Sequence, residues 1–247
     1  MLMKILSLNI NNFGGLECKE QYKEKNKLKE WTSLDKTSES TEIFAYIQQE
    51  KPVIAILHEF ELNTNIANKF IECMELIGYG IIPYEETKLK NPSITLMFVR
   101  KELLYKKLDN PHNFKSEKSL RASVIKAADC IIYGVHIPPT YDSDFWEELI
   151  DFYKKHQGQK LVIIGDYNVY DLGTEQKREY LKLLVLNAKD AWMEKGYSNS
   201  IKTHIKGRRL DYAIMSPSLY ECLNNIRIDS YLMNNDKTDH AALIIEI

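Results

Sequence analysis

The chain alternates short runs of apolar residues with segments in which apolar residues recur every three or four positions. Apolar runs bounded by glycine or polar residues are typical of buried strands, and a repeat near 3.6 residues is typical of an amphipathic helix. The pattern predicts strands at residues 3–10, 53–57, 79–84, 93–99, 123–126, 130–137, 161–166, 210–215, 226–231 and 241–247, and helices at 41–49, 66–77, 145–153 and 175–186. Because these elements interleave without a linker rich in proline, glycine or serine, we expect one α/β domain over residues 1–247.

The clearest strand is Leu161–Ile164, which is followed by Gly165, Asp166, Tyr167 and Asn168. In an extended chain, residues two apart point to the same side. We therefore expect Asp166 and Asn168 to emerge together from the strand end while Tyr167 points back into the core. By itself this arrangement is more typical of a capped turn, but it also suits the handling of water, a metal ion or an oxyanion.

Polar residues follow several other predicted strands in the same way. Each alone is typical of a surface residue or a structural hydrogen-bonding group, but together they supply carboxylates, carboxamides and imidazoles. Such a set suits metal-assisted hydrolysis of a phosphate ester, with Mg²⁺ as the expected ion and Mn²⁺ as the alternative. The residues concerned are Asn9, Glu59, His136, Asp166 with Asn168, Asp211, and Asp239 with His240.

Motifs of several other hydrolases are absent from the sequence. It contains no His-Glu-x-x-His pattern of a zinc peptidase, no Gly-x-x-x-x-Gly-Lys phosphate-binding loop and no Gly-x-Ser-x-Gly of a serine esterase. These absences favour a metal-dependent phosphoesterase over those classes.

The formal net charge of −2 does not by itself indicate a nucleic-acid-binding protein, although local basic positions occur. Arg121 precedes a predicted strand, and Arg208 and Arg209 lie beside Lys202 and Lys206. These arginines could contact phosphates that flank a cleaved bond; the alternative is ordinary surface charge.

The four cysteines are widely scattered and form neither a metal-binding pair nor an evident disulfide framework. No apolar stretch is long enough to span a membrane, and the first ten residues are predicted as a strand, not as a signal peptide. We therefore expect a cytoplasmic protein without membrane insertion.

Residues 16–40 are rich in lysine and glutamate, with aromatic residues only at Tyr22 and Trp31. This composition is typical of a solvated surface insertion. Because the segment follows Asn9 closely, the alternative is a flap whose lysines contact substrate phosphates.

Six short motifs, taken in order along nearly the whole chain, resemble those of the endonuclease/exonuclease/phosphatase superfamily. They are Leu8-Asn9, Leu57-His58-Glu59, Gly134-Val135-His136-Ile137-Pro138, Gly165-Asp166-Tyr167-Asn168, Arg209-Leu210-Asp211-Tyr212 and Thr238-Asp239-His240-Ala241. The resemblance implies a four-layer α/β sandwich, in which two packed, mostly antiparallel β-sheets are flanked by helices and the site lies at one end of the sheets.

The resemblance also implies a role for each matched residue. Glu59 would ligate Mg²⁺ with Asn9 and Asp239 nearby, and Asp166 would orient or deprotonate the attacking water. Asn168 would donate to the phosphoryl group, His240, held by Asp211, would contact the scissile phosphate, and His136 would stabilise or protonate the leaving oxygen. One departure is His58, which stands where the family usually has glutamine and is expected to point away from Glu59.

Three functions remain open at this point. The first is a nuclease acting on DNA or RNA, for which Tyr141 and Trp146 near His136 could stack on bases, although Trp146 fits the core of its helix better. The second is a phosphatase or phosphodiesterase of a small phosphorylated molecule or lipid head group. The third, a binding protein without catalysis, is disfavoured because every matched catalytic position is filled.

Overall fold

The protein has four layers, because successive side chains of the central strands point to opposite faces of each sheet and both faces are covered. The computed structural model describes residues 2–14, 36–84, 89, 92–112, 117–170 and 174–247. In strand β1 (Lys4–Asn9) Ile5 faces the opposite sheet, while Leu6 and Leu8 pack beneath helices on the outer face. In β8 (Lys160–Asp166) Ile164 faces inward and Ile163 packs beneath the helices of the other side. Strands with both faces buried are apolar throughout, as the sequence pattern indicated.

Two six-stranded sheets form the inner layers, in the orders β11-β12-β1-β2-β4-β3 and β5-β6-β7-β8-β10-β9. Among the described strands, only β1 with β2 and β7 with β8 pair in parallel. The remaining strands are β2 (Ile54–Glu61), β3 (Tyr79–Ile81), β4 (Ser93–Arg100), β5 (Tyr105–Lys107), β6 (Ala122–Ala127), β7 (Cys130–His136), β9 (Lys189–Asp190), β10 (Asp211–Met215), β11 (Asn225–Asp229) and β12 (Ala242–Glu246).

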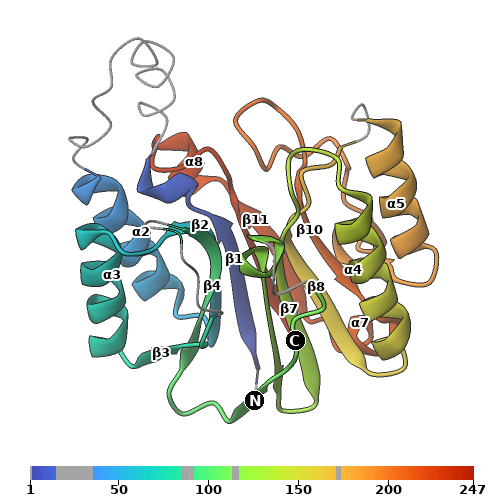
Figure 1. Ribbon diagram of the computed structural model, residues 1–247, viewed down its shortest axis with the longest axis horizontal. Coiled ribbons are helices and arrows are strands. Elements are labelled where there is room, and N and C mark those ends of the chain that lie inside the picture. Colours follow the sequence, from blue (N-terminus) through green and yellow to red (C-terminus); the bar gives the residue numbers. More distant parts are fainter. Residues whose placement is uncertain (1, 15–35, 85–88, 90–91, 113–116, 171–173) are drawn as a thin grey trace.

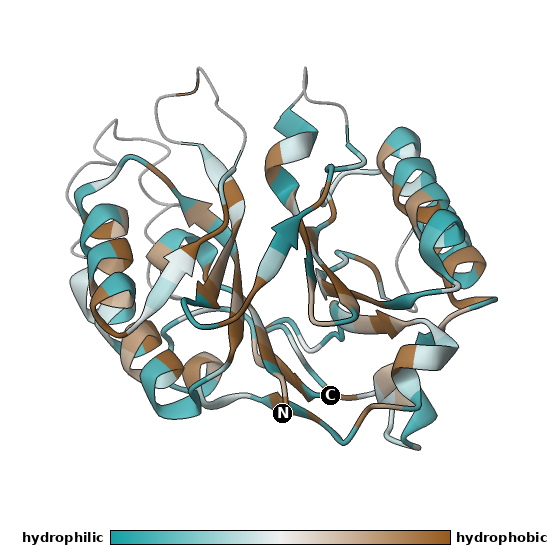
Figure 2. Ribbon diagram, turned by 90° about the horizontal axis from the view of Figure 1, so that it is seen from below, coloured by the Kyte–Doolittle hydropathy of each residue, from teal (hydrophilic) through white to brown (hydrophobic). Residues whose placement is uncertain are grey.

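Helices cover the outer face of each sheet (Figures 1 and 2). Helices α2 (Thr37–Glu50) and α3 (Asn65–Leu76) pack on the first sheet, and α4 (Ser143–His156) and α5 (Glu175–Val185) pack on the second. Shorter helices are η1 (Asn11–Phe13), η2 (Glu117–Arg121), α6 (Ala191–Glu194), α7 (Pro217–Tyr220) and α8 (Tyr231–Asn234). The predicted four-layer α/β sandwich with mostly antiparallel sheets is therefore confirmed.

Several element boundaries differ from the prediction. Helix α2 begins at Thr37, so the end of the segment predicted as a charged insertion is helical, while residues 16–35 lie outside the described residues. The strand predicted to reach residue 231 ends at Asp229, because the Asp229 carboxylate accepts a hydrogen bond from the Tyr231 amide (2.9 Å) and turns the chain into α8. Among the described residues, no helix is long and apolar enough to cross a membrane.

Candidate active site

Parallel pairing in each sheet brings the polar residues that follow the strands to the same end of both sheets, which forms one edge of the molecule. Asn9, the last residue of β1, pairs in register with His58 at the irregularity of β2, and His136 pairs with Asp166 at the ends of β7 and β8. Strand β10 runs antiparallel to β8, so its first residue, Asp211, lies opposite Asp166. Strand β1 runs from the bottom of Figure 1 toward this edge at the top.

The Asn9 carboxamide links the two sheets at this edge. Its Nδ2 donates to Glu59 Oε1 (3.1 Å) and to Asp166 Oδ2 (3.0 Å), and its Oδ1 accepts from the Asn11 amide (3.0 Å). Glu59 sits in an irregularity of β2 with φ +54°, which re-aims its side chain. Asn9 therefore fixes the distance between a buried carboxylate at Asp166 and a partly exposed one at Glu59.

Gly165 and Asn168 shape the turn that follows β8. A Cβ atom on Gly165 would lie 1.9 Å from the Val135 carbonyl oxygen, and its φ of +153° also favours glycine. Asn168 adopts φ +48°, its amide donates to Asp166 Oδ1 (2.9 Å) and its Nδ2 donates to the Ile137 carbonyl (2.9 Å). The turn thus holds the Asp166 and Asn168 side chains together, with Nδ2 of Asn168 3.3 Å from Asp166 Oδ2.

The pair His240–Asp211 lies beside Asp166. His240 Nδ1 donates to Asp211 Oδ2 (2.9 Å), and His240 Nε2 lies 3.7 Å from Asp166 Oδ2. Burial alone would lower the pKa of His240, but the charges of Asp211 and Asp166 raise it to about 9. Burial raises the pKa of Asp166 above the usual carboxylate range, against the opposing charge of His240. The site therefore contains an imidazolium beside a carboxylate that can take up a proton near neutral pH.

His136 is held in one tautomer by Arg121. An Nη1 of Arg121 donates to His136 Nδ1 (3.1 Å), so the imidazole hydrogen lies on Nε2. That nitrogen is buried, is 3.6 Å from both Glu59 Oε1 and Asp166 Oδ2, and has no hydrogen-bond partner among the described residues. Burial, with the charge of Arg121, lowers the pKa of His136 well below its usual value. His136 therefore presents a neutral N–H donor to the site.

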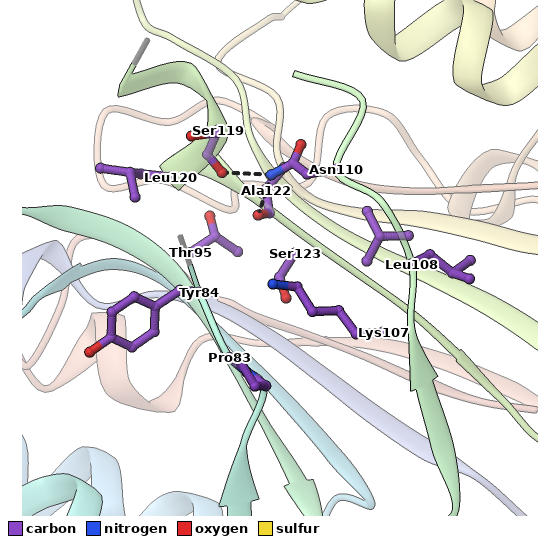
Figure 3. Close-up of a pocket in the computed structure, with 11 residues that line it drawn as sticks. Pro83, Tyr84, Thr95, Lys107, Leu108, Asn110, Ser119, Leu120, Ala122 and Ser123 are labelled. Carbon is purple, nitrogen blue, oxygen red and sulfur yellow. Dashed lines mark hydrogen bonds between the residues drawn. The ribbon is translucent and has the colours of Figure 1, made fainter. Parts of the chain in front are cut away.

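Arg121 is the last residue of the short helix η2, which precedes β6 and is held by hydrogen bonds from neighbouring side chains. Thr95 Oγ1 donates to the Arg121 carbonyl (3.0 Å), and Asn110 donates to the carbonyls of Ser119 (2.7 Å) and Ala122 (3.1 Å). Figure 3 shows the small pocket behind this support, where Asn110 reaches the Ser119 carbonyl. Apart from Lys107, the residues that line this pocket are uncharged, and none of them belongs to the acidic cluster.

Asp239 has a partner that the sequence patterns did not reveal. His204 Nε2 lies 3.3 Å from Asp239 Oδ2, and its Nδ1 accepts from the Lys206 amide (3.0 Å), which places the ring hydrogen on Nε2. The His204 ring also meets His240 edge-on, with 4.8 Å between ring centroids. His204 follows no predicted strand, so its position in an irregular loop gave no periodic signal.

His58 supports the site from within the core. It is fully buried between the sheets, where its Nε2 bonds Ser7 Oγ (2.9 Å) and its Nδ1 bonds Thr95 Oγ1 (3.1 Å). Burial lowers the pKa of His58 to about 3, so the ring is neutral. Its side chain therefore bonds residues of the sheet interior and points away from Glu59, as expected, although β2 continues beyond His58 to Glu61.

The two neighbouring arginines, Arg208 and Arg209, have different surroundings. Arg208 is exposed, lies over the Tyr170 ring (3.9 Å to its centroid) and lines a surface hollow with Lys206. Arg209 is buried and forms a two-pronged ion pair with Asp190, with 3.1 Å between Nη1 and Oδ1. Because this ion pair holds its guanidinium, we interpret Arg209 as a structural residue, which leaves Arg121 and Arg208 as the arginines expected to contact substrate.

The aromatic residues near His136 also differ in their exposure to solvent. Trp146 is fully buried in the core, as the sequence favoured, whereas Tyr141 is 46% exposed and packs against Tyr180 (6.2 Å between ring centroids). Tyr167 is also buried, and its hydroxyl donates to the Ile163 carbonyl (3.1 Å), as expected for a packing residue.

The donor set of the site fits a hard divalent cation. Two groups of described side chains place their ligand atoms within 4.8 Å of one another, one around Asp239 and one around Asp166 with Asp211. The imidazoles in both groups act as hydrogen-bond donors, which leaves these carboxylate oxygens as ligand atoms, and Glu59 belongs to neither group. Asp211 Oδ1 is buried without a hydrogen-bond partner among the described residues. When Asp166 is ionised, the negative charges outnumber the positive ones by two among these described residues, since the carboxylates are Glu59, Asp166, Asp211 and Asp239 and the cations are Arg121 and His240.

Comparisons with solved structures show where this fold occurs elsewhere. An AP endonuclease from Archaeoglobus fulgidus is 18% identical over 98% of both chains, with a TM-score of 0.66. A 3′ phosphatase, NExo, from Neisseria, bound to product DNA hairpin, is 15% identical over 99% of both chains, with a TM-score of 0.67. The AP endonuclease LMAP from Leishmania major is 14% identical over 100% of this chain and 87% of its own, with a TM-score of 0.69.

No protein-family model and no curated protein matches the sequence. At these low identities the structural likeness establishes the fold, and the chain has the fold of the endonuclease/exonuclease/phosphatase superfamily.

Proposed function

We propose that this protein is a metal-dependent hydrolase of phosphodiester bonds that acts as a nuclease on DNA or RNA. The observation that carries the proposal is the convergence at one edge of a raised-pKa carboxylate, an imidazolium and a neutral imidazole donor. These are Asp166, His240 and His136, whose closest side-chain nitrogen–oxygen separations are 3.6 Å and 3.7 Å. Such groups match the needs of water attack on phosphorus.

Glu59 and Asp239 would hold the cation, Mg²⁺ or Mn²⁺, with Asn9 orienting Glu59. When bound, the cation would offset negative charge on the phosphate and lower the pKa of water near it. Carboxylates outnumber cationic groups at this edge, and the two positive charges of a divalent cation would neutralise that excess negative charge. The charge balance therefore supports the assignment.

Side chains of the protein activate the water, hold the phosphate and stabilise the leaving oxygen. Asp166 orients the attacking water and accepts its proton. Asn168 contacts the phosphoryl group from the same turn, by exchanging the longer Nδ2 hydrogen bond to Asp166 (3.3 Å) for one to a phosphate oxygen. His240, charged and fixed by Asp211, holds a phosphate oxygen. His136 donates a hydrogen bond from Nε2 to the leaving oxygen, and so stabilises the negative charge that develops there as the ester bond breaks.

Arg121 and Arg208 extend the proposal to the substrate. Arg121 stands beside His136, and Arg208 with Lys206 provides positive charge around the hollow near Tyr170. Positive side chains on both sides of a phosphodiester site suit a polyanionic substrate. Two of the compared structures are AP endonucleases and one holds a DNA hairpin, which supports nucleic acid as the substrate.

The proposal includes one catalytic domain over residues 1–247 and a cytoplasmic location. Cys73, Cys130 and Cys222 are free thiols, as suits a reducing compartment.

A substrate panel tests the proposed function. Purified protein with Mg²⁺ is incubated with plasmid DNA, single-stranded DNA, RNA, a 3′-phosphorylated oligonucleotide and a small aryl phosphodiester. We expect cleavage of nucleic acid that EDTA abolishes and Asp166→Ala removes. Turnover of only the phosphorylated end or the small ester would replace the nuclease by a phosphatase or phosphodiesterase, and turnover of none would refute hydrolysis.

A further inference from the structure

A buried lysine lies behind the catalytic turns. Lys177 projects from α5, is only 4% exposed, and donates through Nζ to three main-chain carbonyls. These belong to Pro138 (3.1 Å), Pro139 (2.5 Å) and Asn168 (3.1 Å). An ammonium group has three N–H donors, so all of its hydrogen-bonding capacity is directed at two turns.

The turn after β7 needs this support because of its own sequence. Pro138 and Pro139 lack an amide hydrogen and cannot donate to a neighbouring strand. The last main-chain hydrogen bond from this turn to the β8 side is from the Ile137 amide to the Asp166 carbonyl (2.8 Å). Lys177 satisfies the carbonyl groups of the two prolines from outside the turn, where the prolines themselves offer no amide hydrogen for a strand contact.

Burying an ammonium group is costly unless its hydrogen bonds are satisfied. No carboxylate of the described residues lies within 4.0 Å of Lys177 Nζ, so carbonyl groups alone satisfy it. An apolar side chain would dock α5 equally well at lower cost. The presence of a lysine at position 177 is therefore explained by the hydrogen bonds that its ammonium group makes to the carbonyl groups of two turns.

The two turns that Lys177 joins carry catalytic groups of the proposed function, on which this inference rests. His136 immediately precedes the first turn, and Asn168 contributes one of the three carbonyls. We propose that Lys177 is a positioning residue, whose ammonium ties the 136–139 turn to the 166–168 turn and so fixes His136 relative to Asp166 and Asn168.

The kinetic test compares Lys177→Met with Lys182→Met, a surface lysine of the same helix that pairs with Glu179. Displacing a catalytic group by about 1 Å can cost about 100-fold in rate. We expect K177M to lower kcat on nucleic acid by about 10- to 100-fold while KM changes less than about threefold. Because His136 serves the leaving oxygen, an activated aryl phosphodiester should lose less than about fivefold. K182M should match wild type.

A second readout does not depend on activity. Amide hydrogen exchange should accelerate in K177M at Ile137 and Asn168, whose amides bond the Asp166 carbonyl and Asp166 Oδ1. The Ser216 amide, which bonds the Leu161 carbonyl at the other end of β8, should be unchanged. If the wild-type protein cleaves nothing while K177M still exchanges faster, the proposed function is refuted and the tie between the turns stands.

Equal kcat in K177M and K182M, or a loss shared equally by nucleic acid and the aryl ester, would overturn the positioning role. Unchanged exchange at Ile137 and Asn168 would also overturn it. If K177M does not fold, K177Q, which keeps one amide donor group, is subjected to the same comparisons, and the same results would support or overturn the role.

Discussion

Replacing Asp211 by asparagine tests the electrostatic design of the site, because it removes one charge and keeps the shape. Asp211 is the strongest influence that raises the pKa of His240 to about 9, against burial. Without its charge, burial, which is the largest single influence on His240, should bring the pKa of His240 down to about the ordinary value of 6.5 against the remaining charges of Asp166 and Glu59. At pH 7.5, fewer than about one molecule in ten would then carry the proton on His240.

Two losses combine to set the size of the effect. Depopulating the imidazolium costs about tenfold at pH 7.5. Weakening the 2.9 Å charge-assisted bond that orients the ring costs a further 1.5–3 kcal/mol, or about 10- to 150-fold. We therefore expect Asp211→Asn to lower kcat by about 10²–10³-fold with a small change in KM.

The assay is the rate of nucleic acid cleavage between pH 6 and 10 at saturating Mg²⁺, with Asp129→Asn as the control, since Asp129 lies exposed in the turn between β6 and β7. Wild-type activity should fall as pH rises through about 9, where His240 loses its proton. The ratio of variant to wild-type activity should rise on acidification. A D211N enzyme within about threefold of wild type, or a ratio independent of pH, would refute the role of the Asp211–His240 pair.

Four further outcomes are expected. Glu59→Gln should raise the Mg²⁺ concentration for half-maximal activity by about 10- to 100-fold; an unchanged metal titration would remove Glu59 from the cation site. Arg208→Ala should weaken substrate binding and reduce the slope of log affinity against log salt by about one, and an unaltered slope would contradict phosphate contact. Arg209→Ala should destabilise the protein by about 3–5 kcal/mol in chemical denaturation, since it leaves Asp190 without its partner; a stability equal to wild type would contradict the structural assignment. In EDTA, the free energy of unfolding should fall by up to about 3 kcal/mol as pH rises from 6.5 to about 9, because native His240 keeps its proton while the unfolded chain has lost it, and a stability that rises over this range would contradict the raised pKa.

The architecture was predictable because its central strands carry strong local patterns. The apolar run 161–164 with Gly165 marks β8, and the strands predicted at 123–126 and 130–137 are present as β6 and β7, which pair up to Ala127 and Cys130. The short edge strands β5 and β9 were missed, since three or two residues carry no measurable periodicity. Boundaries also shifted where side chains capped a turn, as at Asp229.

The site was predictable only in part, for a different reason. Residues at the ends of buried strands, such as Asp166 and Asp211, are placed by the sheet register that the pattern reveals. Lys177 and His204 instead act through partners in turns and loops far along the chain, which no spacing in the sequence encodes. Arg208 and Arg209 differ because neighbouring residues of an extended segment point to opposite sides, so only the structure separates the exposed guanidinium from the buried one.

The central claim is that water attacks phosphorus at this edge of the sheets with help from Asp166. The most direct measurement is cleavage of a labelled oligonucleotide with Mg²⁺ in H₂¹⁸O, followed by mass spectrometry of both products. We predict one ¹⁸O atom in the phosphate-bearing product from wild type, and no product from Asp166→Ala. Cleavage that places no ¹⁸O in the phosphate, or Asp166→Ala cleavage at the wild-type rate, would contradict the account.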